Sequence, residues 1–86
     1  MTSVPTQKRN WGRGASDRAK DEFFESYLHW REACENAHAA YERWLRSEPE
    51  RRRLAFAAYR AALDGEDYAA RVHSVVAERL RDEIAA

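Results

Sequence analysis

The chain has 86 residues, 35% of them charged, and its 15 basic and 15 acidic side chains give a formal net charge of zero. A chain of this length forms one domain at most, and its small interior makes association with another copy an expected source of extra burial. Because the charges balance, the composition indicates no general attraction to nucleic acid or to an anionic membrane. The one cysteine in the sequence excludes an intrachain disulfide framework.

The expected cellular location follows from two features of the sequence. No apolar run approaches the ~18 residues of a membrane-spanning helix. The first residues, Met-Thr-Ser-Val-Pro-Thr-Gln-Lys-Arg, lack the apolar stretch of a secretion signal. We therefore expect a cytoplasmic protein that has no membrane partner.

Residues 1–15 are predicted to form an irregular arm, because they hold two of the three glycines and show no apolar periodicity. Lys8, Arg9 and Arg13 make this arm basic, and it carries no acidic residue. Trp11 is unusual in such a polar segment, and a large ring there suits an anchor on the chain's own helices or on a partner. We expect Trp11, Arg9 and Arg13 to bind a partner.

A first helix is predicted from about residue 16 to residue 47, which at 1.5 Å per residue would span about 45 Å. Ser16 or Asp17 is suited to cap its first free amides. Seven residues of this helix repeat with alternating steps of four and three: Phe23, Tyr27, Trp30, Cys34, Ala37, Tyr41 and Trp44. That period of 3.5 is typical of a stripe that packs against another helix. Five of the seven are aromatic, so we expect a wide interface built from large rings.

Small residues form a column beside this stripe, which would allow a partner helix to come close. They are Ser26, Ala33, Ala40 and Ser47.

A break in the helix is predicted at residues 47–50. Ser47 and Glu50 have the spacing of a reciprocal capping box, although Glu48 could instead be the cap with Pro49 at the first helical position. A second helix is then predicted over about 48–64, where Gly65 can end it, and a third over about 66–86. Whether these two are separate or form one kinked helix is left open by the sequence.

The predicted fold is therefore all-α, with helices 48–64 and 66–86 folded back on the long first helix as a helical hairpin or a three-helix bundle. Residues 16–86 form its single domain. Neither later helix, at about 25–30 Å, is long enough to cover a 45 Å stripe. Either the two lie in series along the first helix, or a second subunit covers the rest, and we favour a homodimer.

Three residues are candidates for a metal site. Glu35 and His38 have the Glu-x-x-His spacing found in helical di-iron proteins, and Cys34 lies one turn before His38. The pattern is short, further inward carboxylates are missing, and a lone cysteine in a packed stripe is usually a small buried hydrophobe. We expect no metal, no cofactor and no catalytic residue, since no nucleophile constellation or phosphate loop is present.

A basic cluster near the break offers another kind of site: Arg43, Arg46, Arg51, Arg52 and Arg53. Arginines hold phosphates, and with Trp11 they could bind nucleic acid. Glu42, Glu48 and Glu50 are interleaved with them, which favours a solvated helix end with ion pairs.

The function predicted first is a scaffold or protein-binding module that forms a homodimer through the aromatic stripe and also contacts a protein of unknown identity. A nucleic-acid-binding or regulatory protein is the alternative. A metal-binding bundle ranks third.

Overall fold

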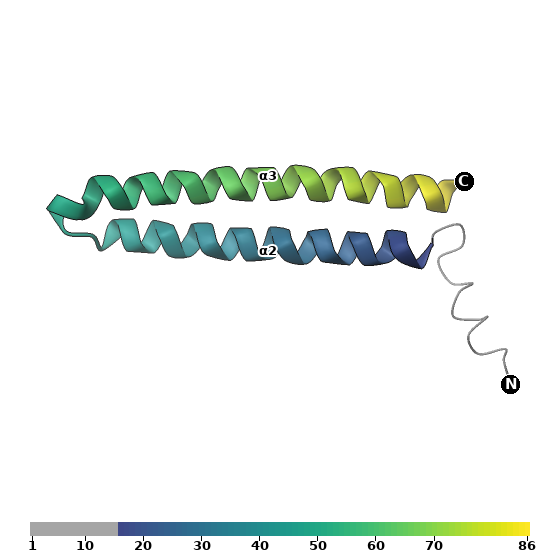
Figure 1. The fold of residues 1–86 in the computed structure, drawn as a ribbon, viewed down its shortest axis with the longest axis horizontal. Coiled ribbons are helices and arrows are strands. Elements are labelled where there is room, and N and C mark those ends of the chain that lie inside the picture. Colours follow the sequence, from purple (N-terminus) through teal and green to yellow (C-terminus); the bar gives the residue numbers. More distant parts are fainter. Residues whose placement is uncertain (1–15) are drawn as a thin grey trace, which may run out of the picture.

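The computed structural model of the chain describes residues 16–86. They form two long antiparallel helices, α2 (Asp17–Leu45) and α3 (Arg52–Ala85), joined by a short turn that contains the 3-10 helix η1 (Pro49–Arg51). Figure 1 shows that the start of α2 and the end of α3 lie together at the end of the hairpin opposite the turn. Trp11, Arg9, Arg13 and the rest of the predicted arm lie outside the described residues.

The predicted division into a second and a third helix is wrong, because α3 runs without a break through Gly65. A Cβ at this position would meet nothing within 4 Å, and a glycine inside a helix costs only about 1 kcal/mol relative to alanine. The all-helical class, the long first helix and the hairpin are confirmed. The three-helix bundle is not formed by the described residues.

Local capping explains where α2 begins and ends. The Oγ of Ser16 accepts a hydrogen bond of 3.0 Å from the backbone N–H of Ala19, so the predicted cap at Ser16 is confirmed. The helix ends two residues earlier than predicted. There the Ser47 hydroxyl donates to the Trp44 carbonyl at 2.7 Å, and this contact closes the last turn.

The turn follows the alternative that placed the cap at Glu48. Glu48 has extended backbone angles, Pro49 takes the first position of η1, and Glu48 makes no side-chain capping bond. The reciprocal capping box between Ser47 and Glu50 is therefore wrong. Proline decides between the two readings, because its ring disfavours a helical conformation for the residue before it.

Three polar contacts fix the antiparallel register of the helices. At the open end, the Ser16 backbone N–H donates to Glu83 Oε1 at 3.0 Å. Farther along, Ser26 Oγ lies 2.8 Å from His73 Nδ1. Near the middle, Cys34 Sγ donates to Glu66 Oε2 at 3.3 Å. Each step forward along α2 is thus matched by a nearly equal step back along α3.

The stripe of α2 that packs against α3 differs from the predicted stripe. It is rotated around the helix toward the flanking column of small residues. Its positions again alternate in steps of four and three, and none of them is exposed: Ala19, Phe23, Ser26, Trp30, Ala33, Ala37, Ala40, Trp44 and Ser47. Its large members are Phe23, Trp30 and Trp44, and only its small members Ala19, Ser26, Ala37 and Ala40 are buried. Tyr27, Cys34 and Tyr41 lie on one edge of the packed stripe.

A second heptad stripe, which the sequence analysis did not identify, runs along the whole of α3. Its nine positions keep the same alternation through Gly65, and none is exposed: Ala55, Tyr59, Ala62, Glu66, Ala69, His73, Val76, Leu80 and Glu83. Because each stripe meets the other along its full length, α3 alone covers α2. Of the two alternatives, the structure shows the one in which the later segments lie in series along the first helix, and they do so as one continuous helix.

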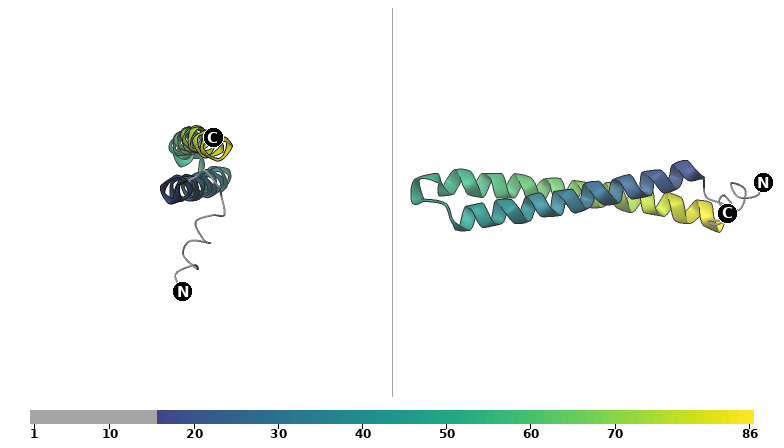
Figure 2. Two further views of the ribbon diagram at one scale, coloured as in Figure 1. Left: turned by 90° about the vertical axis from the view of Figure 1, so that its right-hand side faces the viewer. Right: turned by 90° about the horizontal axis from the view of Figure 1, so that it is seen from below.

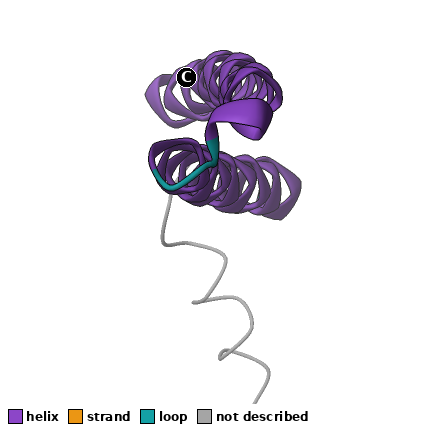
Figure 3. Ribbon diagram, turned by 90° about the vertical axis from the view of Figure 1, so that its left-hand side faces the viewer, coloured by secondary structure: helices purple, strands orange, loops and turns teal. Residues whose placement is uncertain are grey.

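The hairpin has a narrow interior. In Figures 2 and 3 the two helices cross at a shallow angle and form a single pair, so within residues 16–86 each helix is covered only on the side that faces the other. No large side chain of the described residues is fully buried. Two helices cannot surround a core in the way that three or four can, and apolar residues remain on both long sides of the pair.

Candidate interaction surface

The two long sides of the hairpin differ in composition. One side, which we call the aromatic face, is lined by the columns that flank the two packed stripes, namely Tyr27, Cys34 and Tyr41 of α2 and Phe56, Leu63, Ala70 and Ala77 of α3. We call the other the mixed face. Its flanking columns are Glu22, His29, Asn36 and Arg43 of α2 and Ala58, Gly65, Val72 and Arg79 of α3. The aromatic face is apolar on both helices, whereas the mixed face carries charged residues on both, namely Glu22 and Arg43 on α2 and Arg79 on α3.

A first cluster of rings gathers on the aromatic face toward the open end of the hairpin. The His73 ring stacks on Trp30 with an interplanar angle of 15° and a centroid distance of 5.7 Å. Phe23 and Tyr27 are tilted against the same imidazole, at 4.8 and 5.8 Å. Ser26 holds the imidazole by its ring nitrogen, so a polar group is accommodated among the rings without an unpaired buried atom.

A second cluster lies toward the turn. Trp44 stacks on Tyr59 with an interplanar angle of 14°, and Phe56 is tilted against Trp44 at 4.9 Å. Tyr41 completes the group, at 5.3 Å from Tyr59. Aromatic pairs of this geometry contribute about 0.5–1.5 kcal/mol beyond the area they bury. The predicted role of the α2 rings in helix packing is thus seen within one chain, with Tyr59, Phe56 and His73 as their partners.

A hollow of about 270 Å³ separates the two clusters. Its lining includes Cys34, His38, Leu63 and Glu66. Desolvation raises the pKa of the Cys34 thiol, and the hydrogen bond that it donates to Glu66 raises it further. Since a neutral thiol is a poor nucleophile, the cysteine acts here as a packing residue.

The predicted metal candidates are not gathered into a ligand set. Cys34 bonds to Glu66, His38 Nε2 lies 3.2 Å from Glu42, and Glu35 is exposed. Within residues 16–86, no group of three or more histidine, cysteine, aspartate and glutamate side chains is placed to hold a metal ion.

Three of the five predicted arginines come together on the mixed face. Arg43, Arg46 and Arg51 line a groove of about 360 Å³ beside Leu54 and Ala58. Arg52 instead donates to the Ser47 carbonyl at 3.3 Å and so helps to hold the turn. Arg53 is exposed and is not part of the groove lining.

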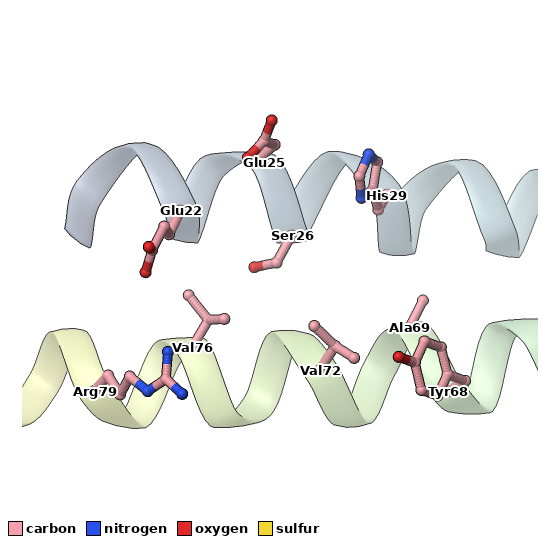
Figure 4. A pocket seen from close by; sticks show the side chains of 9 residues that line it. All are labelled: Glu22, Glu25, Ser26, His29, Tyr68, Ala69, Val72, Val76 and Arg79. Carbon is pink, nitrogen blue, oxygen red and sulfur yellow. The ribbon is translucent and has the colours of Figure 1, made fainter. Parts of the chain in front are cut away.

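A second groove, of about 410 Å³, lies on the mixed face near the open end. Figure 4 shows Val72 and Val76 of α3 pointing toward α2, with Ser26 opposite them, and Glu25 pointing away from α3. Glu22 and Arg79 also line this groove, so it combines an apolar floor with charged edges of both signs.

The contacts that His73 and Glu66 make with the first helix were not predicted. Both lie in the heptad stripe of α3, where apolar residues are usual. The signal that could have found them is the uninterrupted alternation of four and three along residues 55–83, which places a polar side chain in the stripe at each of these two points.

No family model, curated protein or solved structure matches the chain. Neither helix within residues 16–86 combines the length and the apolar character needed to cross a bilayer. The candidate site is therefore defined by the chain's own geometry, in which the aromatic face is the side whose flanking columns are apolar on both helices.

Proposed function

We propose that the protein is a small helical module for protein–protein interaction, without catalysis, and that it works as a homodimer. The observation that supports this proposal is the exposed apolar surface of the hairpin. Phe24 and Leu45, at the α2 edge of the aromatic face, are 64% and 60% exposed. Tyr41, Phe56 and Leu63 of the same face are exposed between them, and apolar residues gathered on one face of a small protein favour an interaction site.

The length of the first helix no longer supports a dimer, because α3 packs along the whole of it. Support comes instead from the thin interior. The side chains buried in the described part are three alanines and one serine, and a domain of about 70 residues with so little interior is marginal by itself. Association would bury the large side chains that the hairpin leaves exposed.

Sedimentation equilibrium tests the proposed function. At micromolar concentration the measured mass is expected to be about twice the chain mass of 10.0 kDa. A single species of one chain mass at this concentration would contradict the homodimer.

Nucleic-acid binding is the second candidate, and one observation favours it. Arg43, Arg46 and Arg51 surround a single groove near the turn, where their guanidinium groups could contact successive phosphates. If this function is correct, binding to a nucleic acid weakens steeply with salt. Apolar association would change little over the same titration.

A further inference from the structure

The aromatic face is suited to a partner that is itself an apolar pair of helices. Between Tyr27 and Tyr41 its α2 column contains Cys34 and no charged residue, and its α3 column from Phe56 to Ile84 is entirely apolar. On the mixed face, by contrast, the α2 column holds Glu22 and Arg43, and the α3 column holds Arg79. A partner that buries both helices of the hairpin at once would therefore cover the aromatic face.

The residues of the aromatic face are arranged nearly symmetrically about Cys34. Tyr27 and Tyr41 each lie seven residues from it, on either side. Phe24 and Leu45 lie ten and eleven residues away. One aromatic cluster lies on each side of Cys34 along the hairpin. A two-fold rotation about an axis beside Cys34 would bring the first cluster of one chain onto the second cluster of another.

The size of the face also fits a second copy of the chain. Helix α2, with 29 residues, is about 44 Å long, and two helices packed 8–10 Å apart present a face about 20 Å wide. The resulting area of roughly 900 Å² is close to the ~800 Å² that each partner buries in a standard interface. The formal net charge of zero means that two copies do not repel each other over long range.

We propose that the aromatic face binds the same face of a second copy in antiparallel orientation, with a two-fold axis beside Cys34, and so completes a four-helix bundle. This assignment rests on the homodimer proposed above and adds to it the face, the orientation and the axis. In the dimer α2 packs against α2 of the partner subunit, Tyr27 meets the partner's Tyr41, and the two turns lie at opposite ends. Such an interface is isologous, as a closed dimer requires.

Distance measurements between spin labels in the full-length dimer test this arrangement. One sample carries the label on the native Cys34. The other carries it in the variant Cys34→Ser/Glu48→Cys, which moves the single label site to the turn. We expect the Cys34 labels to lie within about 20 Å of each other. The turn labels, fourteen residues away along each helix, should be about 40 Å apart.

Other distance patterns would overturn the proposal. Short distances in both samples would mean a parallel dimer. A long distance between the Cys34 labels would mean that the axis or the face is different.

A matched pair of variants provides a second readout that needs no label. Leu63→Glu places a charge on the aromatic face, and Leu54→Glu places one on the mixed face, where Leu54 is 74% exposed. We expect Leu63→Glu to raise the dimer dissociation constant at least 100-fold and Leu54→Glu to change it less than threefold, with circular dichroism confirming that both remain helical. Equal weakening by both variants, or the reverse order, refutes the assigned face.

If the unmodified protein itself is monomeric, the proposed function fails and the face assignment fails with it, whereas a dimer with the wrong distances overturns only the assignment.

Discussion

At the level of single residues, we expect the removal of Trp30 to lower the stability of the protein more than the removal of any other side chain of the first aromatic cluster. It stacks on His73 and contacts Tyr27, but it remains half-buried. Trp30→Ala is therefore expected to lower the free energy of unfolding by about 2–3 kcal/mol, below the 3–5 kcal/mol of a fully buried tryptophan. Urea denaturation measures this difference.

Leu28→Ala is the matched control for Trp30→Ala. Leu28 lies two residues earlier on α2 and is 59% exposed, so its truncation should change the free energy of unfolding by less than about 0.5 kcal/mol. A loss below about 1 kcal/mol for Trp30→Ala would contradict the contact with His73.

The raised pKa of the Cys34 thiol predicts that the stability of the fold depends on pH. Desolvation and the bond to Glu66 raise its pKa, so the folded chain holds the thiol proton more tightly than the unfolded chain. This contribution to stability is fully present below the ordinary thiol pKa, and it is lost as the pH rises through the raised value. The rate of alkylation against pH should therefore have its midpoint above that of the same chain unfolded in urea.

Glu66→Gln separates the two causes of the raised pKa at Cys34. The amide keeps the shape of the side chain and removes its charge, so the alkylation midpoint should fall part of the way toward that of the unfolded chain. The rest of the shift comes from desolvation, which is the larger cause. An unchanged midpoint in the variant would show that Glu66 does not act on the thiol.

At the level of elements, the unbroken α3 makes Gly65 a residue without a structural requirement. It is exposed and helical, with space for a Cβ. Gly65→Ala is expected to stabilise the protein by about 0.5–1 kcal/mol, because alanine loses less backbone entropy on folding.

Thermal unfolding followed by circular dichroism measures the effect of Gly65→Ala, and Ala61→Gly one turn earlier should destabilise by a similar amount. Destabilisation by Gly65→Ala would instead indicate that the helix ends at this glycine, as the sequence first indicated.

The two stripes explain why helix boundaries were the weak part of the sequence analysis. Gly65 lies between acidic residues, where a glycine is a common helix end, and a third helix was therefore predicted after it. The spacing of the heptad stripe is a stronger signal than the glycine, because the alternation of four and three in α3 continues through residue 65 without a shift. A glycine that interrupts neither the heptad spacing nor the packing is tolerated inside a helix.

At the level of the whole molecule, stability and association should be coupled. The described hairpin buries no large side chain completely, so burial at a dimer interface would supply part of the free energy that keeps it folded. Since dimerisation then favours the folded state by mass action, the thermal midpoint is expected to rise with protein concentration between about 1 and 100 μM. A midpoint independent of concentration across this range would mean that the hairpin folds as a stable monomer.

Features that depend on local chemistry followed from the sequence. They are the helical class, the cap at Ser16, the position of the turn and the importance of the rings on the first helix. Hydrogen bonds at helix ends, the fixed angle of proline and a period of 3.5 act over a few residues, and these effects can be recognised in one segment at a time. The five aromatic residues of the predicted stripe do contact α3 or one another in the structure.

The exact packed stripe was decided only by the tertiary structure. Two heptad stripes overlap on the first helix and share Phe23, Trp30, Ala37 and Trp44, so the sequence of that helix is compatible with either. The approach of α3 selects the stripe that contains Ser26 and Ala40, because two backbones come close only where small side chains lie between them. The same approach places Tyr27, Cys34 and Tyr41 at the edge and brings Glu66 and His73 to them. Which residues face the partner helix and which stay free for another molecule thus depends on both helices together, and no single segment of the chain contains that information.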